Sequence, residues 1–587
     1  MPSRLTFILA GEKKEIILSD DDLKEKPSIL DIARFNRIYI TNFCNGSGAC
    51  GKCRVILKEK KGVEIKKPEL VRRALSSEEI KKGYTLACLA IPERDCDAVV
   101  EIPTESMEDE HQVLIDTDIV KHGHVACGDV GIAADIGTTT VAAYLVDLKT
   151  GDVIDGVSDY NSQISYGADV MSRINHALEK SKSRGADDIQ GAITGTLNKL
   201  TGKFFIRNNI SKISKFVFSG NTTMIYLLIK KNPKIILDNI QDAEFKNSYN
   251  IKADDLGLVY KKTGEGEHQQ DGSPPYVYML PNIANYVGGD IVSDIMVSGM
   301  FESDEVSLII DVGSNGEVAL GNRDWMVCCS TSAGPAFEGG ETSCGMRATK
   351  GAIDRVKLNN FGEDVEYRVI GNKKPQGLCG SGLITLLAEL FKNEVIDHRG
   401  KFDRFAGIER LRKCKNIPSA YIPGADFSSE DEFDVDIMEY VIVRCEDSGH
   451  GKDIAINEID IQNIIYSKAA IYAGASTLMS VGIGWDDIHK IFIAGGFGNY
   501  IDIESAITFG LLPDVAREKY EFIGNGSLKG ACEILRDEKK KKIADKIARK
   551  TTYFDLSTNS QFMQEYSDAA CIPHKNMDLF PTVEDEF

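Results

Sequence analysis

The chain has 587 residues, which is too long for one small module and suggests several domain-sized units. Hydrophobic residues make up 42% and charged residues 27%, a composition that excludes a disordered or collagen-like chain. The 89 acidic and 69 basic residues give a formal net charge of −20, which disfavours binding to nucleic acid or to an anionic membrane. No apolar stretch is long enough to span a bilayer, and charges follow the N-terminus too closely for a signal peptide, so we expect a cytoplasmic protein.

Four cysteines near the N-terminus have the spacing of iron–sulfur ligands. Cys44, Cys50 and Cys53 lie in a glycine-rich loop, and Cys88 comes from a later segment. Glycines allow positive φ angles, so the backbone can curl around a cluster while three thiolates converge on it. We therefore predict a [2Fe–2S] cluster bound by these four residues, as in ferredoxins with a β-grasp domain, and an ordinary thiol at Cys96. Zinc is the alternative, but zinc sites usually pair two close Cys or His motifs, whereas the fourth cysteine here is single.

Apolar patterns predict the other elements of this first domain, which we place at residues 1–104. They indicate a hairpin, a helix and two further strands over residues 5–18, 28–38, 55–57 and 99–102. The next segment, 105–127, begins with an acidic run that has no periodicity, so we interpret it as a linker. Such a linker would let the small domain change position.

Two similar turns occur later in the chain, each between two apolar strands. The first runs from Asp135 to Thr140 and the second from Asp311 to Glu317. Glycine and hydroxyl residues in such turns leave backbone amides free to hold phosphate oxygens, and the aspartate can orient Mg²⁺ or its waters. One such turn is weak evidence, but its duplication indicates two lobes that clamp one triphosphate. We expect these lobes at 128–300 and 301–587.

Two more strands that end in small residues, at 216–223 and 491–499, support a nucleotide site because backbone can approach a nucleotide closely there. Glu317 or Asp290 is expected to position the attacking water, although Asp290 could instead cap a helix. The predicted nucleotide-binding residues are Asp135, Gly137, Thr138, Thr139, Thr140, Gly220, Asn221, Asp311, Gly313, Ser314, Asn315, Gly316, Gly495, Gly496, Phe497 and Gly498.

These motifs resemble those of the acetate and sugar kinase, heat-shock protein and actin superfamily (ASKHA), over roughly residues 128–570. The resemblance implies an α/β architecture of two RNase-H-like lobes with ATP between them. With the ferredoxin-like domain added, the chain is similar to the reductive activators of corrinoid proteins. The additional segments that carry this similarity are 332–339, 344–348, 377–382 and 572–574.

That family returns an electron to accidentally oxidised Co(II) corrinoid at the expense of ATP. The similarity implies reduction to Co(I) through the [2Fe–2S] cluster, with ATP and Mg²⁺ as further cofactors. It also implies a corrinoid protein of a methyltransferase system and a low-potential electron donor as partners, and a homodimer.

Other functions remain open. A small-molecule kinase would use the same ATP cleft but would leave the cluster domain without a task. An activator of radical dehydratases would hold a [4Fe–4S] cluster between two subunits, which the four cysteines do not suggest. A ferredoxin with a regulatory nucleotide-binding module and no turnover is the alternative that is not an enzyme.

Cobalt chemistry suggests one more candidate residue. Co(II) is easier to reduce when a strong lower ligand is replaced by a weak oxygen donor. Ser381 lies between Gly380 and Gly382, which we expect to expose its hydroxyl, so it is our candidate for that donor. The alternative is that these glycines form a turn of the nucleotide lobe.

Overall fold

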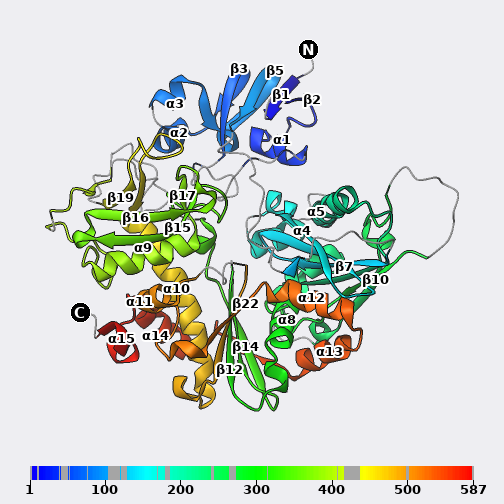
Figure 1. Cartoon of the computed structure of the whole chain (residues 1–587). Coiled ribbons are helices and arrows are strands. Elements are labelled where there is room, and N and C mark those ends of the chain that lie inside the picture. Colours follow the sequence, from blue (N-terminus) through cyan, green and yellow to red (C-terminus); the bar gives the residue numbers. More distant parts are fainter. Residues whose placement is uncertain are drawn as a thin grey trace.

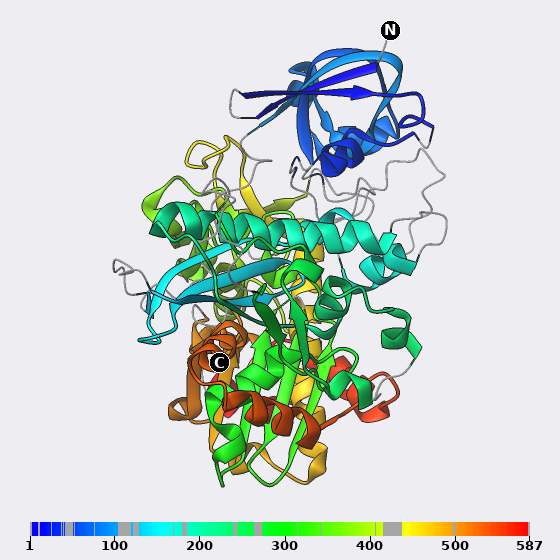
Figure 2. The ribbon, with the colours of Figure 1, turned by 90° about the vertical axis from the view of Figure 1, so that its right-hand side faces the viewer.

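The computed structural model forms a small N-terminal domain and two larger α/β lobes (Figures 1 and 2). Within its described residues, no helix combines the length and the apolar character needed to cross a membrane. The described residues are 3–9, 12–24, 26–36, 38, 40, 51, 53–75, 77–103, 119–120, 128–167, 169–178, 185–238, 243–262, 273–313, 315–340, 342–405, 407–414, 437–496 and 501–584.

The N-terminal domain contains a five-stranded sheet in the order β2-β1-β5-β3-β4. The alternation around Leu5 and Phe7 places both side chains in the core, and β1 pairs antiparallel with β2, so the predicted hairpin is confirmed. The described residues of this core all lie between Leu5 and Ile102. The elements are β1 (Ser3–Leu9), β2 (Glu12–Leu18), α1 (Ile29–Phe35), β3 (Arg54–Ile65), α2 (Pro68–Ala74), α3 (Ser77–Lys81), β4 (Tyr84–Leu86) and β5 (Ala90–Ile102).

The first lobe is built on a six-stranded sheet in the order β10-β11-β9-β6-β7-β8. Strands β6, β7 and β8 form an antiparallel meander, and β9 and β11 extend the sheet in parallel. Its strands are β6 (Val130–Ile136), β7 (Thr140–Asp147), β8 (Val153–Tyr160), β9 (Lys215–Gly220), β10 (Tyr249–Lys252) and β11 (Tyr276–Met279). Its helices are α4 (Val170–Leu178), α5 (Gly185–Asn208), α6 (Thr222–Leu228), α7 (Lys234–Asp238) and α8 (Gly289–Ser298).

The second lobe repeats this arrangement in the sheet β22-β21-β12-β13-β14-β23. Strands β12, β13 and β14 form the antiparallel meander, and β21 and β22 are the parallel additions. The strands are β12 (Ser307–Val312), β13 (Gly316–Gly321), β14 (Met326–Thr331), β21 (Lys490–Ala494), β22 (Tyr520–Gly524) and β23 (Thr551–Tyr553). The helices are α10 (Glu458–Leu478), α11 (Ile503–Phe509), α12 (Gly526–Arg536), α13 (Lys540–Lys550), α14 (Ser560–Ala569) and α15 (Pro581–Glu584).

Two three-stranded sheets lie in the sequence between β14 and α10. One consists of β15 (Ala352–Asn359), β16 (Asp364–Val369) and β17 (Gly377–Leu378), and is followed by α9 (Gly380–Lys392). The other consists of β18 (Leu411–Lys413), β19 (Met438–Val443) and β20 (Ile454–Asn457).

The two lobes share part of their hydrophobic core. Helix α12 follows β22 in the second half of the chain, yet it packs against β6, β9 and α8 (Figure 1). Its buried Leu528 belongs to the same core as Ala133 of β6 and Ile309 of β12. The division into lobes at 128–300 and 301–587 stays a prediction. Although α12 and α13 belong to the second range in sequence, both helices pack against α8 of the first lobe.

Candidate nucleotide and cluster sites

Two of the predicted cluster ligands lie side by side in the N-terminal domain. Cys53 precedes β3 and Cys88 follows β4, and β3 and β4 pair antiparallel. Their Sγ atoms are 3.3 Å apart, both side chains are buried, and neither forms a disulfide. Such a thiol pair fits two ligands of one metal cluster.

The other predicted ligands, Cys44 and Cys50, lie outside the described residues. Cys96 sits on β5 with its thiol 3.7 Å from the Arg4 carbonyl oxygen, so its neighbours differ from those of the Cys53 and Cys88 pair. The assignment of four ligands, with Cys96 excluded, stays a prediction that this geometry supports.

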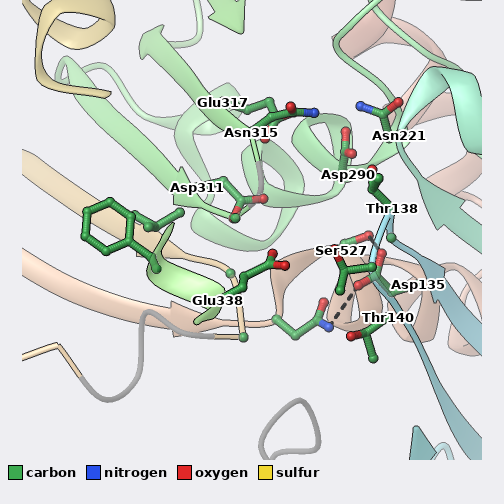
Figure 3. A pocket seen from close by; sticks show the side chains of 18 of the residues that line it. Asp135, Thr138, Thr140, Asn221, Asp290, Asp311, Asn315, Glu317, Glu338 and Ser527 are labelled. Atoms are coloured by element: carbon green, nitrogen blue, oxygen red, sulfur yellow. Dashed lines mark hydrogen bonds between the residues drawn. The ribbon is translucent and has the colours of Figure 1, made fainter. Parts of the chain in front are cut away.

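A cavity of about 210 Å³ lies between the two lobes (Figure 3). The lining brings together most of the predicted nucleotide-binding residues, from both halves of the chain. Gly220 and Gly316 do not line it, but each is next in sequence to a residue that does, Asn221 and Glu317 respectively. Ser314, Phe497 and Gly498 lie outside the described residues. The predicted residues in the lining are Asp135, Gly137, Thr138, Thr139, Thr140, Asn221, Asp290, Asp311, Gly313, Asn315, Glu317, Gly495 and Gly496.

In each of the two glycine turns at the cavity, the glycine amide donates a hydrogen bond to a carbonyl within the same turn. The Gly137 amide donates to the Thr140 carbonyl at 3.0 Å, and the Gly313 amide donates to the Asn315 carbonyl at 3.1 Å. A Cβ at Gly137 would lie 2.7 Å from the Thr140 oxygen, so this position requires glycine. The two motifs therefore both form turns closed by a hydrogen bond from the glycine amide, with different lengths, and both line the cavity.

Asp135 receives hydrogen bonds from α12, which reaches it from the second half of the chain. The Asn525 side-chain amide donates to one carboxylate oxygen at 3.0 Å, and the Ser527 hydroxyl lies 2.8 Å from the other. The Ser527 hydroxyl also contacts that of Ser219, which in turn contacts Ser293 on α8. The predicted nucleotide residue Asp135 is thus held by a polar network that spans both lobes.

The carboxyl groups of the site are buried close to one another. Burial, together with repulsion from neighbouring carboxylates, raises the pKa of Asp290 to about 6 and that of Asp311 to about 7. Burial is also the main reason that the pKa of Glu317 lies well above its usual range, while Asp135 shows an upward shift despite its hydrogen bonds. A bound cation would offset this repulsion, so the donor set fits a divalent metal such as Mg²⁺.

Asp294 is a further carboxyl group of this cluster, on α8 one turn after Asp290. Its side chain is fully buried, and burial together with the nearby Asp311 raises its pKa strongly. Within the described part of the chain, no three His, Cys, Asp or Glu side chains converge on one metal position. A metal ion here would therefore need phosphate oxygens or waters as additional ligands, as Mg²⁺ commonly does.

Asp290 lies both at the start of a helix and in the wall of the cavity. It lies in the first turn of α8, where Oδ1 accepts hydrogen bonds from the Gly288 and Ile291 amides at 3.0 and 2.9 Å. The same side chain lines the cavity and points toward Thr138 and Asn221 (Figure 3). The N-cap residue itself is Gly288, and Asp290 accepts a hydrogen bond from its amide. The role of Asp290 in positioning water stays a prediction, which its place in the cavity wall supports.

Ser381 is placed differently from expectation. It lies in the first turn of α9 with only 2% of its surface exposed, and its hydroxyl is 3.3 Å from the Cys379 thiol. The expectation that the flanking glycines expose this hydroxyl is wrong, because Gly382 packs so tightly that a Cβ there would lie 2.2 Å from the Ile353 carbonyl oxygen. Gly380 lines the cavity, as the alternative of a nucleotide-lobe turn implies.

Several residues of the cavity were not predicted as site residues from the sequence. Asn525 and Ser527 follow a strand that ends in glycine, as the residues of the predicted motifs do. We did not recognise this segment as part of the site because its pattern was not duplicated elsewhere in the chain. Further charged examples are Glu338 and Arg347, which line the cavity, and Asp294, which lies close to its carboxyl groups.

Sequence comparisons agree with the class that the fold and site define, an ATPase of the ASKHA type joined to an iron–sulfur domain. Residues 20–93 match a "2Fe-2S iron-sulfur cluster binding domain", residues 130–303 a "RACo middle region", and residues 305–584 a "C-terminal domain of RACo the ASKHA domain". The cofactors of the chain are accordingly a [2Fe–2S] cluster and ATP.

Individual relatives define the family. The chain is 35% identical over 443 residues to the corrinoid activation enzyme RamQ of Eubacterium limosum, covering 74% of this chain and 69% of that protein. It is 27% identical over 463 residues to a [Co(II) methylated amine-specific corrinoid protein] reductase of Methanosarcina barkeri, covering 74% and 76%. A solved reductive activator for corrinoid, iron-sulfur protein covers 99% of this chain and 100% of its own, with 33% identity and a TM-score of 0.68. The chain belongs to the family of reductive activators of corrinoid proteins.

Proposed function

We propose that this protein reduces the Co(II) form of a corrinoid protein to Co(I), using one electron from its [2Fe–2S] cluster and the hydrolysis of ATP. The observation that supports this proposal is that one chain holds both a buried thiol pair, Cys53 and Cys88, and a cavity lined by the two glycine turns at 135–140 and 311–317. When bound, the cluster supplies one-electron chemistry, which matches the one-electron step at cobalt. If the protein were a small-molecule kinase, this thiol pair would have no function.

In the nucleotide site, Asp135 and Asp311 would orient Mg²⁺ or its waters, while the amides of the two turns hold phosphate oxygens. Their carboxyl groups approach the cavity from opposite lobes (Figure 3). Asp290 or Glu317 would position the attacking water, because both line the same cavity. Closure of the lobes around the nucleotide would then exclude bulk water from the phosphates.

The energy of ATP is needed because cobalt in a corrinoid accepts this electron only at a very low potential. A nucleotide can shift an equilibrium only if it binds two states with different affinity. The polar network around Asp135, which joins α12 and β6 at the site, would provide such a difference if nucleotide binding rearranged its hydrogen bonds.

Four further features of the function are part of the proposal. The corrinoid protein belongs to a methyltransferase system, a separate low-potential donor reloads the cluster, the protein is a homodimer, and it resides in the cytoplasm. Ser381 serves as a weak oxygen donor to cobalt, which requires its buried hydroxyl to become accessible when the corrinoid protein binds.

Phosphate release tests this function. The full-length protein, loaded with iron and sulfide, is mixed with Mg–ATP and with a Co(II) corrinoid protein from the same source organism. We expect phosphate release that the corrinoid protein stimulates. ATP binding without any turnover, with or without the corrinoid protein, would instead favour a ferredoxin with a regulatory nucleotide module.

The serine has its own test. We expect the Co(II) spectrum of the corrinoid protein to show a change in axial coordination when the activator is added, and Ser381→Ala to abolish this change. A change that persists in Ser381→Ala would exclude the serine, and no change with the wild-type protein would exclude ligand exchange altogether.

A further inference from the structure

The nucleotide cavity contains an imbalance of charge. Among the described residues that line it, Arg347 is the one basic side chain, and five are acidic. ATP is itself an anion, and a single Mg²⁺ offsets only part of its charge, so carboxylates in the wall would repel it. A guanidinium group suits phosphate because it can donate two parallel hydrogen bonds. The acidic residues are Asp135, Asp290, Asp311, Glu317 and Glu338.

Arg347 is oriented by a contact between the two lobes. Its guanidinium carbon lies 3.9 Å from the centre of the Tyr160 ring, a distance typical of a cation–π interaction. Tyr160 ends β8 and is the register partner of Thr140, the residue that closes the first phosphate-type turn. The loop that carries Arg347 in the second half of the chain therefore places this cation beside the phosphate turn of the first lobe.

The backbone next to Arg347 is tied to the segment that carries Ser381. The Met346 amide donates to the Leu378 carbonyl at 2.8 Å, and the Leu378 amide donates to the Cys344 carbonyl at 2.9 Å. Leu378 ends β17, and Ser381 follows three residues later at the start of α9. A displacement of the Arg347 loop must therefore carry the backbone before Ser381 with it, or break both hydrogen bonds.

The other side of the same loop is anchored to α10. The Ser343 amide donates to the Asp460 carboxylate at 2.9 Å, and Asp460 also takes part in the capping box of α10 with Asn457. Because α10 packs against β13 and β14, this anchor fixes the loop to the second lobe, while Tyr160 belongs to the first. Relative movement of the lobes would act on the loop between these two points.

We propose that Arg347 binds the phosphates of ATP and, through the paired backbone of Cys344, Met346 and Leu378, transmits the presence of the nucleotide to the turn that carries Ser381. This inference rests on the proposed use of ATP, and it identifies the residue that connects the nucleotide to the predicted cobalt-facing segment. The step is one of binding and positioning, and no covalent bond changes in it.

Binding measurements test the first half of the inference. In calorimetric titrations of the full-length protein, we expect Arg347→Gln to weaken Mg–ATP binding by about 10- to 100-fold, the range for loss of a charged hydrogen-bond donor. Adenosine should bind the variant and the wild type equally. Arg323→Gln is the matched control, because Arg323 is exposed and pairs with Asp304 outside the cavity. Equal affinities of Arg347→Gln and wild type for Mg–ATP would overturn the inference while leaving the proposed function intact, whereas a wild type that binds no Mg–ATP would overturn both.

Hydrogen exchange tests the second half. We expect saturating Mg–ATP to slow amide exchange in the peptide that covers 377–392 of the wild type and of Arg323→Gln. In Arg347→Gln, with the nucleotide concentration raised to saturation, this protection should be absent even though nucleotide is bound. Protection of the same size in Arg347→Gln would show that the signal reaches Ser381 by another route and would overturn the coupling.

Discussion

The cluster domain and the nucleotide-binding lobes differ in how their cores are built. The described core of the cluster domain lies between Leu5 and Ile102, and it has no member from the lobes. The two lobes instead share a core, in which Leu528 of α12 packs with residues of both central sheets. A domain with its own core can change position without unfolding, whereas lobes that share a core must move with the elements between them.

Charged surface residues join the cluster domain to the rest of the chain. Glu79 of α3 pairs with Arg54, the residue after Cys53, at 3.2 Å, and with Lys452 of the loop between β19 and β20 at 2.5 Å. Figure 1 shows α3 close to this side of the second half. A contact of this kind is weak enough to open, which suits a domain that must deliver an electron.

The largest expected effect concerns the cluster domain. Cys88→Ser removes a predicted ligand, and we expect iron and sulfide to be lost from the purified protein. Cys96→Ser is the matched control and should retain both, because its buried thiol contacts the Arg4 carbonyl instead. The assignment would be contradicted by a cluster that survives in Cys88→Ser and is lost in Cys96→Ser.

The next effect concerns the lobes. Asp311→Ala removes a carboxylate at the end of β12, and we expect ATP hydrolysis to fall by about 100-fold, as for loss of one preorganised electrostatic group. Steady-state phosphate release measures this loss, and Asp304→Ala, at an exposed position, is its control. Hydrolysis by Asp311→Ala at the wild-type rate would remove the phosphate-clamp assignment.

A smaller effect should appear in the stability of the nucleotide-free lobes. The pKa of Asp311 rises from 3.8 to about 7 on burial, so between these values the folded protein binds more protons than the unfolded chain. This carboxyl group therefore lowers the free energy of unfolding as pH rises through that window. We expect Asp311→Asn to stabilise the Mg²⁺-free protein at pH 7.5 by about 1–3 kcal/mol, since one pKa unit corresponds to about 1.4 kcal/mol.

Thermal unfolding at several pH values checks this sign. The advantage of Asp311→Asn should shrink toward pH 4, and Asp304→Asn should show no such dependence. A variant that is less stable than the wild type at pH 7.5 would contradict the interpretation of a repulsive carboxyl cluster.

The smallest effect concerns the contact between the two regions. Lys452→Glu should weaken the docking of the cluster domain by about 0.5–1 kcal/mol, the usual range for a partly exposed ion pair. Small-angle scattering should detect a larger average radius, and the double variant Glu79→Lys with Lys452→Glu should restore part of the compaction. Lys58→Glu is the control, because Lys58 pairs with Glu101 inside the domain. An unchanged radius in Lys452→Glu would show that other contacts position the domain.

The parts of the fold that could be predicted from sequence are those that local patterns determine. The two glycine turns were recognisable because each combines an aspartate, a glycine and hydroxyl or amide residues between two apolar strands, and their duplication indicated two lobes. The structure explains the glycine at 137, where a Cβ would lie 2.7 Å from the Thr140 carbonyl oxygen. Asn525 could not be placed in the same way, because it bonds Asp135 across 390 residues of sequence. Ser381 shows the opposite error, since its glycine neighbours suggested exposure, whereas the close packing of Gly382 on the Ile353 backbone leaves Ser381 buried.

The appearance of Co(I) in a corrinoid protein tests the central claim most directly. The pre-reduced full-length protein is mixed with a Co(II) corrinoid protein, and the absorbance of Co(I) is followed with and without Mg–ATP. We predict Co(I) formation that requires Mg–ATP and that is absent with the cluster-free Cys88→Ser variant. Co(I) formation at the same rate without nucleotide, or with the cluster-free variant, would contradict the account.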